Sequence, residues 1–404
     1  MKIPPETRPL CVAPFAALKV GADGGVSPCC EFAGQIGSLK DNSLKAIWEG
    51  EELRDLRVAL ASGEKVKTCW KCWQAEETNG VSLRQSLNSR FADRLPQSAS
   101  DAALAPDHPV YLDIRFSNLC NFRCRTCHHG ASSRWFSDAK ALGQTAGRKA
   151  LLSAFDPTQD APTQFEEIGE KVTDLYFAGG EPLMEKQHFD LLRRLISQKR
   201  TDIRLYYNTN LSTLDFEGSD ILQLWQSFRY LHVEASIDAI GAAGAYIRRG
   251  FDWDIFSANL DRLRKECPQV NVNIGVTVSV FNLLKLTELH RKLVKESGVS
   301  PESFNFHAVQ SPRYYDIATL PKVVKERAMV QIEAYAAELS AQNPESQVAA
   351  QLNHIVEHMN LLPAIAPPDD TESLREQFRD ITKQLDALRS EDTLSIFPEL
   401  ATLL

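Results

Sequence analysis

The segment VYLDIRFSNLCNFRCRTC, residues 110–127, joins a run of β-branched and aromatic residues to three closely spaced cysteines. The run VYLDIRF at 110–116 has the composition of a strand, and Cys120, Cys124 and Cys127 follow directly after it. Three thiols cannot all be paired with one another, because three is odd. In parallel α/β folds the carboxyl ends of the strands carry the chemistry, so the segment predicts a site at such an end.

Runs of the same kind recur along the chain. Five more lie at 172–178, 203–208, 231–238, 270–280 and 304–310, and segments with helical spacing separate them. Strands that alternate with helices predict a parallel sheet. Six such units suit a partial α/β barrel or a doubly wound sheet.

Regions of different character flank these units. Five of the nine cysteines lie within the first 72 residues, where a capped helix is predicted over 43–60. The polar segment 96–106 reads as a linker, and helices are predicted after residue 320. The last helix carries apolar residues at helical spacing: Leu374, Phe378, Ile381, Leu385 and Leu388. We therefore predict three regions, residues 1–95, 108–320 and 321–404.

Charge and hydropathy exclude several classes of protein. The net charge is −8 and there is no long block of Lys or Arg, which argues against nucleic acid as a partner. The start, MKIPPETRPL, has no apolar run of the kind found in signal peptides, and no stretch of 18 apolar residues occurs. We expect a cytoplasmic protein without a membrane partner. In that compartment, clustered cysteines indicate metal or redox sites before disulfides.

The number of cysteines in the loop bears on its chemistry. Iron–sulfur clusters are usually held by four thiolates, whereas Cys120, Cys124 and Cys127 offer three. One iron would then keep an open position, which is how a metal site binds a substrate. On spacing alone, a zinc site completed by His128 or His129 and a set of ordinary buried thiols remain alternatives.

This Cys-x3-Cys-x2-Cys loop after the first strand, with FAGGEPLM at 177–184 after the second, resembles the radical S-adenosylmethionine (SAM) superfamily. The resemblance implies a partial (β/α)6 TIM barrel in which the three cysteines hold a [4Fe–4S] cluster. It implies that SAM chelates the fourth iron and is cleaved to methionine and a 5′-deoxyadenosyl radical, which abstracts hydrogen from a substrate. One departure is Thr126, since many members carry an aromatic residue just before the last cysteine.

The same resemblance implies residues that bind SAM. In the GGEP motif of the family the backbone hydrogen-bonds the SAM amino group, and glycines allow such close approach. Here the motif is Gly179, Gly180, Glu181 and Pro182. At the ends of later strands we predict contacts to the ribose and the methionine carboxylate from Asn210, Ser236, Arg248 and Asn282. Arg248 is the best suited of these, because arginine binds carboxylates in a bidentate manner.

The N-terminal cysteines form a second set. Spacing alone leaves a zinc ribbon and an iron–sulfur site open. The segments DGGVSPCC at 23–30, IGSLKDNSLKAIW at 36–48 and CWKC at 69–72 resemble the SPASM/twitch auxiliary-cluster domain, although in many relatives that domain follows the barrel. The resemblance implies a second [4Fe–4S] cluster with a role in electron transfer. Its ligands would be Cys11, Cys29, Cys69 and Cys72, which leaves Cys30 and Cys267 spare.

Two functions follow from these motifs. The first is a radical SAM oxidoreductase or maturase that acts on a peptide, a protein side chain or a small molecule, with flavodoxin or ferredoxin as electron donor. The alternative is a non-enzymatic iron–sulfur or zinc scaffold, which would have no use for GGEP. Tyr314 and Tyr315, after the sixth strand, are candidate catalytic residues. The segment HIVEH at 354–358 matches a zinc-protease pattern, but we expect a surface helix there and no metal.

Overall fold

The computed structural model describes residues 9–77, 81–96, 101, 106–155, 169, 171–360 and 368–404. The chain forms two compact units. The first comprises Met1–Leu119, Leu151–Tyr207 and Asp215–Leu231, and the second Cys120–Ala150, Asn208–Leu214 and His232–Leu404. The three predicted regions, 1–95, 108–320 and 321–404, divide the chain differently from these two units, and they remain a prediction. Most of the predicted linker at 96–106 lies outside the described residues.

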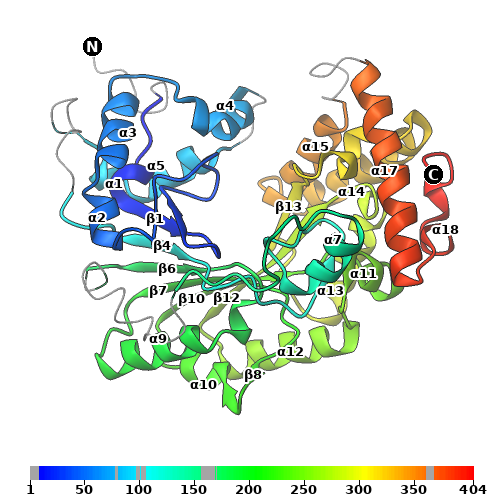
Figure 1. Ribbon diagram of the computed structural model, residues 1–404. Coiled ribbons are helices and arrows are strands. Elements are labelled where there is room, and N and C mark those ends of the chain that lie inside the picture. Colours follow the sequence, from blue (N-terminus) through cyan, green and yellow to red (C-terminus); the bar gives the residue numbers. More distant parts are fainter. Residues whose placement is uncertain are drawn as a thin grey trace. The chain divides into compact units, whose positions relative to one another are not determined.

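The sheet of the first unit has the strand order β3-β2-β1-β4-β6-β7 (Figure 1). Its strands are β1 (Ala17–Val20), β2 (Gly25–Ser27), β3 (Gly37–Ser38), β4 (Tyr111–Ile114), β6 (Asp174–Phe177) and β7 (Arg204–Thr209). The strands β1, β4, β6 and β7 run parallel, whereas β2 is antiparallel to β1 and to β3. The sequence predicted β4, β6 and β7. It did not predict β1, β2 and β3, which have only two to four residues each.

The register of these strands separates an apolar face from a polar face. On one face, the row Val20–Ile114–Phe177–Tyr207 is buried. Helices α9 (Lys186–Ser197) and α10 (Ile221–Trp225) lie along it, with His188 packed 4.8 Å from Phe177 and Trp225 4.8 Å from Tyr207, between ring centroids (Figure 1). The opposite face carries the row Lys19–Asp113–Tyr176–Tyr206. The apolar face therefore anchors the helices and leaves polar groups on the other side.

Short helices complete the first unit: α1 (Ala13–Ala16), α2 (Leu44–Trp48), α3 (Glu51–Ala61), α4 (Trp70–Glu77) and α5 (Leu83–Arg90). The helix predicted over 43–60 is two helices, because the chain turns at Gly50, which has extended backbone angles and begins α3. Ser43 caps α2 as predicted, since its hydroxyl accepts a hydrogen bond of 3.2 Å from the Ala46 N–H. The strands β8 (Asp215–Phe216) and β9 (Ser219–Asp220) form a separate hairpin.

The sheet of the second unit has the strand order β10-β12-β13. These strands are β10 (Tyr230–Ser236), β12 (Val270–Val278) and β13 (Phe304–Ala308), and β12 and β13 are parallel. The longer helices are α12 (Trp253–Glu266), α13 (Leu286–Glu296), α14 (Lys322–Gln342) and α15 (Gln347–His358). The α/β class and the six predicted strands are confirmed. The pairings among the described residues do not close into a barrel, as a partial barrel requires.

Helix α17 (Pro368–Arg389) has a buried stripe that differs in part from the prediction. Leu374, Phe378 and Leu385 are buried, but Leu388 is 46% exposed. The stripe instead continues through Thr382 and Arg389. At 3.6 residues per turn, position 389 follows 378, 382 and 385 along one face, whereas 388 lies about 100° away. The prediction for Leu388 was wrong because the helix buries an arginine rather than a leucine at its last turn.

None of the helices in the described ranges is both long enough and apolar enough to cross a lipid bilayer.

Candidate functional site

The three-cysteine loop, residues 120–127, lies in the second unit and is held by backbone pairing. Its strand β5 (Arg123–Cys124) is antiparallel to β11 (Arg248–Arg249), so that Cys124 lies opposite Arg248. The Cys127 N–H donates to the Cys124 carbonyl at 3.1 Å, and the Trp135 indole donates to the same carbonyl at 2.7 Å. None of the three cysteines forms a disulfide bond. The loop thus presents three thiols on a backbone with fixed partners.

Burial controls the protonation of these thiols. It raises the pKa of Cys124 and of Cys127, while the positive charge of Arg248 works in the opposite direction at both. Without a metal, both sulfurs are therefore protonated at neutral pH. A metal or a cluster would bind here with release of protons, because the thiolate is the ligand.

Arg248, opposite Cys124 of the loop, forms an ion pair with Asp238. Its guanidinium donates to both oxygens of Asp238, at 2.8 and 3.0 Å, and Asp238 also accepts from the Thr277 N–H at 2.9 Å. Both charged groups are largely buried. The sequence analysis missed Asp238, although it ends the same ASID segment as Ser236. The contact of Arg248 with a SAM carboxylate remains a prediction, and in the structure its bidentate partner is Asp238.

The predicted asparagines hold neighbouring backbone and side chains. The Asn210 amide donates to the Asn121 side chain at 2.9 Å, inside the loop. The Asn282 amide donates to the carbonyls of Asp238 and Thr277, at 2.9 and 3.0 Å, and its oxygen accepts from the Ser279 N–H at 2.7 Å. Ser236 is half-buried at the end of β10. Asn210 therefore contacts the loop directly, whereas Asn282 fixes the turn after β12.

The two tyrosines lie in an aromatic core. Tyr315 is fully buried, with ring centroids 5.2 Å from Phe281 and 6.0 Å from Phe378. Tyr314 packs against Ala318 and Leu374. This packing gives each ring a structural role, and the catalytic role remains a prediction.

The histidine pair in α15 has the surface character that the sequence indicated. His358 lies 3.0 Å from a carboxylate oxygen of Asp316, and the side chain of His354 is 44% exposed. The two histidines therefore have different surroundings and do not converge on one site.

The GGEP segment lies in the first unit and packs against the end of β4. Gly179 has φ +120°, a conformation that favours glycine. A Cβ on Gly180 would lie 2.0 Å from the Leu119 carbonyl oxygen, and the Glu181 N–H donates to that oxygen at 2.7 Å. The Glu181 side chain accepts from the Leu183 N–H at 3.2 Å. Glycine is required at 180 because the backbone of Leu119 fills the space.

Glu185 is a half-buried acid at this end of the sheet that the sequence did not indicate as a site residue. It follows GGEP by three residues, and the Ser117 hydroxyl donates to its carboxylate. Burial raises its pKa to about 7, against which the Ser117 hydrogen bond acts only in part. No sequence pattern distinguished this acid, since its hydrogen-bond partner Ser117 lies 68 residues earlier.

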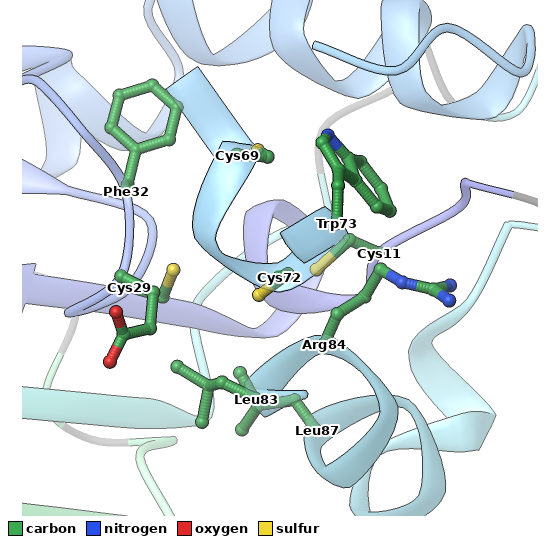
Figure 2. A pocket seen from close by; sticks show the side chains of 10 residues that line it. Cys11, Cys29, Phe32, Cys69, Cys72, Trp73, Leu83, Arg84 and Leu87 are labelled. Atoms are coloured by element: carbon green, nitrogen blue, oxygen red, sulfur yellow. The ribbon is translucent and has the colours of Figure 1, made fainter. Parts of the chain in front are cut away.

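The four predicted auxiliary cysteines line one cavity in the first unit (Figure 2). Cys11 precedes α1, Cys29 follows β2, Cys69 ends a 3-10 turn at Lys67–Cys69, and Cys72 lies in α4. Phe32, Trp73, Leu83 and Leu87 provide apolar walls, and Glu31 and Arg84 complete the lining. Cys30 does not line the cavity and is exposed.

Hydrogen bonds hold the segments that carry these cysteines. The Asn88 side chain accepts from the Val12 N–H at 2.7 Å and donates to the Leu10 carbonyl at 2.9 Å, on either side of Cys11. The Ala33 N–H donates to the Thr68 carbonyl at 2.8 Å, which joins the turn after Cys29 to the backbone before Cys69. The four thiols thus come from segments that the fold ties together.

Burial raises the pKa of Cys11 to about 12 and that of Cys69 to about 11. Four thiols around an apolar cavity are the donor set of a structural iron–sulfur cluster or a zinc ion. Within the described ranges, no group of three or more His, Cys, Asp or Glu side chains has the geometry of a site for a single metal ion.

Comparison with known families identifies both regions. Residues 114–290 match the radical SAM superfamily, and residues 11–73 match SPASM, an iron–sulfur cluster-binding domain. These matches define the class, an enzyme superfamily that uses a [4Fe–4S] cluster and S-adenosylmethionine. The chain thus contains a region that matches the radical SAM superfamily, and the region that matches SPASM lies ahead of it in the sequence. The predicted family and cofactors are confirmed.

Solved structures show distant likeness. Native anSMEcpe with bound AdoMet has 15% identity and a TM-score of 0.41, over 58% of this chain and 63% of that chain. Streptococcus suis SuiB bound to the precursor peptide SuiA has 13% identity and a TM-score of 0.36, over 74% of this chain and 53% of that chain. The chain thus spans less than two thirds of either protein. The search of curated proteins gave no match.

The first prediction concerns Gly180. Replacement by alanine should lower the free energy of unfolding by about 3 kcal/mol, the upper end for overpacking, because the Leu119 backbone cannot move aside like a side chain. Anaerobic urea unfolding measures the change. Gly34→Ala is the control, since its Cβ would meet only ordinary contacts at 3.5 Å or more. A Gly180→Ala protein as stable as Gly34→Ala would contradict the close approach.

The second prediction concerns pH. Because its pKa in the folded protein is raised to about 7, Glu185 keeps its proton up to about pH 7, whereas the ordinary pKa of a glutamate is 4.5. The folded state then binds more protons between these values, so stability falls as pH rises from 4.5 to 7. Glu185→Gln should remove this loss, about 3 kcal/mol, and raise the melting temperature at pH 8 but not at pH 5. The exposed control Glu64→Gln should follow the wild type at both pH values.

Proposed function

We propose that this protein reductively cleaves S-adenosylmethionine and uses the resulting 5′-deoxyadenosyl radical to abstract hydrogen from a substrate C–H bond. The observation that carries the proposal is the loop 120–127, which offers three thiols outside disulfide bonds on a backbone paired with Arg248 and Arg249. A cluster bound there would supply one electron to the sulfonium of SAM. Cys120, Cys124 and Cys127 would hold it, and the missing fourth thiol would leave one iron open for SAM.

The other residues of the proposal hold and orient the backbone and side chains of the site. Gly179 and Gly180 let the backbone at the end of β6 pack directly on the turn after β4, so that amide and carbonyl groups there have fixed directions. Asp238 holds Arg248 in one orientation through two hydrogen bonds. Asn210 holds Asn121 within the loop. Fixed polar groups of this kind orient a ligand without reorganisation when it reacts.

For the auxiliary site we propose a second [4Fe–4S] cluster held by Cys11, Cys29, Cys69 and Cys72. The shared cavity supports this assignment, and so does the exposure of Cys30 outside it. Four protein thiolates would leave no iron open to a substrate. The role proposed for this cluster is therefore electron transfer.

For the substrate we propose a peptide, a protein side chain or a polar small molecule. The polar row Lys19–Asp113–Tyr176–Tyr206 on the sheet face opposite α9 and α10 supports a substrate that offers hydrogen-bonding groups. The Arg115 guanidinium lies 3.3 Å from an oxygen of Asp113 and adds a charged pair to that face.

The proposed setting is the cytoplasm, with a flavodoxin or a ferredoxin as electron donor. Low-potential clusters are stable in that reducing compartment, and the net charge of −8 favours neither nucleic acid nor an anionic membrane as partner. We assign the protein to the oxidoreductases or maturases of the superfamily.

The test of the function is anaerobic reconstitution with iron and sulfide, followed by SAM and dithionite. The protein should turn brown and release 5′-deoxyadenosine and methionine, and replacement of Cys120, Cys124 and Cys127 by alanine should abolish the release. The triple variant should keep the auxiliary iron. A colourless wild-type protein that binds zinc and leaves SAM intact would favour the scaffold instead.

A further prediction separates the two adjacent cysteines. The reconstituted wild type should hold roughly eight irons per chain, and Cys29→Ala roughly four, because each [4Fe–4S] cluster contributes four. Cys30→Ala is the matched control and should keep the wild-type content, since its side chain lies outside the cavity. Iron analysis of the desalted proteins measures both. Equal iron in the two variants would mean that Cys29 is not a ligand.

A further inference from the structure

The C-terminal helix α17 packs against the three-cysteine loop within the second unit. Leu385 forms a buried cluster with Trp135 and Ala139, and Ile381 and Cys127 pack against that cluster. Trp135 is the residue whose indole donates to the Cys124 carbonyl at 2.7 Å. Figure 1 shows α17 beside α7 (Phe136–Ala141), which carries Ala139. Apolar contacts therefore connect residues near the C-terminus to the backbone of the loop.

Charged contacts also connect residues 386–391 to the three-cysteine loop. Arg125, which lies between Cys124 and Cys127, is 1% exposed. Its Nη2 donates to Asp386 at 2.5 Å and to Glu391 at 2.6 Å, and its guanidinium stacks 3.7 Å from the ring centre of Tyr246. An arginine inside the loop is therefore neutralised by two carboxylates that lie more than 260 residues later in the chain.

Asp386 is the centre of this contact. It accepts from Arg125, from the Tyr246 hydroxyl at 2.9 Å and from the Thr393 N–H at 2.9 Å. Burial favours its neutral form, but the Thr393 hydrogen bonds and the charge of Arg125 outweigh burial and hold its pKa below the ordinary value. Asp386 is therefore ionised at neutral pH and bound on three sides.

Two more arginines connect the same segment to the loop. Arg249, on the strand that pairs with the loop, donates to Glu391 and to the Arg389 carbonyl, both at 2.7 Å. On the other side, Asp138 accepts from Arg123 at 2.9 Å and from Arg389 at 2.8 Å. Arg123, Arg125 and Arg249 thus each have a partner in residues 386–391, either directly or through Asp138.

We propose that Asp386 and Glu391 are positioning residues for the cluster-binding loop, which they hold through Arg125 and Arg249 so that the thiols of Cys124 and Cys127 keep the directions needed to bind the cluster. This inference rests on the proposed function, since it takes the loop to be the cluster site. The function itself requires only the thiols and gives these carboxylates no role. Groups that orient metal ligands in this way commonly govern how tightly the metal is held.

The test compares Asp386→Asn with Asp392→Asn. Both remove one negative charge from the same segment, but the Asp392 side chain accepts a hydrogen bond from the Leu394 N–H of the next helix turn, a contact that asparagine can keep. Hydrogen–deuterium exchange of the anaerobic, cluster-loaded protein is followed in peptides that cover 120–135. In Asp386→Asn, exchange there should be roughly tenfold faster than in the wild type, because a hydrogen bond to a charged group is lost. Peptides from 11–73 should not change.

A second readout is the loss of iron to a chelator. Asp386→Asn should lose about half of its iron roughly 10 to 100 times faster than Asp392→Asn, the usual effect of removing a group that orients metal ligands. Glu391→Gln keeps the Asp386 contact and guards against a failure of Asp386→Asn to fold. It should show a smaller increase in the same peptides.

The outcomes separate this inference from the function. Loop exchange and iron loss in Asp386→Asn and Glu391→Gln that equal those of Asp392→Asn would overturn the positioning role, even if the wild type cleaves SAM. Faster exchange in 120–135 would support it, even if the wild type releases no 5′-deoxyadenosine, in which case the proposed function alone would fail.

Discussion

The antiparallel pairing of β5 with β11 is the contact on which the second unit depends. It places Cys124 opposite Arg248 and Arg123 opposite Arg249, so that two cysteine-loop residues and two arginines share one short ladder. Each of these arginines then finds a carboxylate: Asp238 for Arg248, Glu391 for Arg249 and Asp138 for Arg123. Arg248 is largely buried, and a buried charge is tolerated only when it is paired, so the ladder requires a carboxylate beside Arg248, which Asp238 supplies.

The first unit follows a different constraint, which is the register of its parallel strands. Residues in register share a face, so one face collects Val20, Ile114, Phe177 and Tyr207 and the other collects polar groups. The apolar face is covered by α9 and α10. The same unit also has a cavity lined by four thiols from residues 11–72. A hydrogen bond to the Asn88 side chain and one between Ala33 and Thr68 hold the segments that carry these thiols. The first unit thus contains both a sheet with one face covered by helices and a cavity lined by four thiols.

The sequence was sufficient for features that depend on local pattern. Six strands and the three-cysteine loop follow from composition and spacing, and so does the burial of Leu374, Phe378 and Leu385 in α17. The auxiliary cysteine set follows from the resemblance to the SPASM/twitch domain. The sequence was insufficient where burial depends on distant partners. Nothing local distinguishes Glu185 from a surface acid, because Ser117 provides its contact. Arg389 replaces Leu388 in the buried stripe because Asp138, 251 residues earlier, neutralises it. Strands β1 to β3 have only two to four residues each, which is too few for a periodic pattern to indicate a strand. They form because they pair with neighbouring strands.

The link between Arg125 and residues 386 and 391 has a consequence for biosynthesis. A ribosome makes the chain from its N-terminus, so the cysteines at 120, 124 and 127 emerge long before the acids that neutralise the arginine between them. During that interval the guanidinium lacks these two counter-charges. The native contacts of Arg125 can therefore form only after residues 386 and 391 have been synthesised.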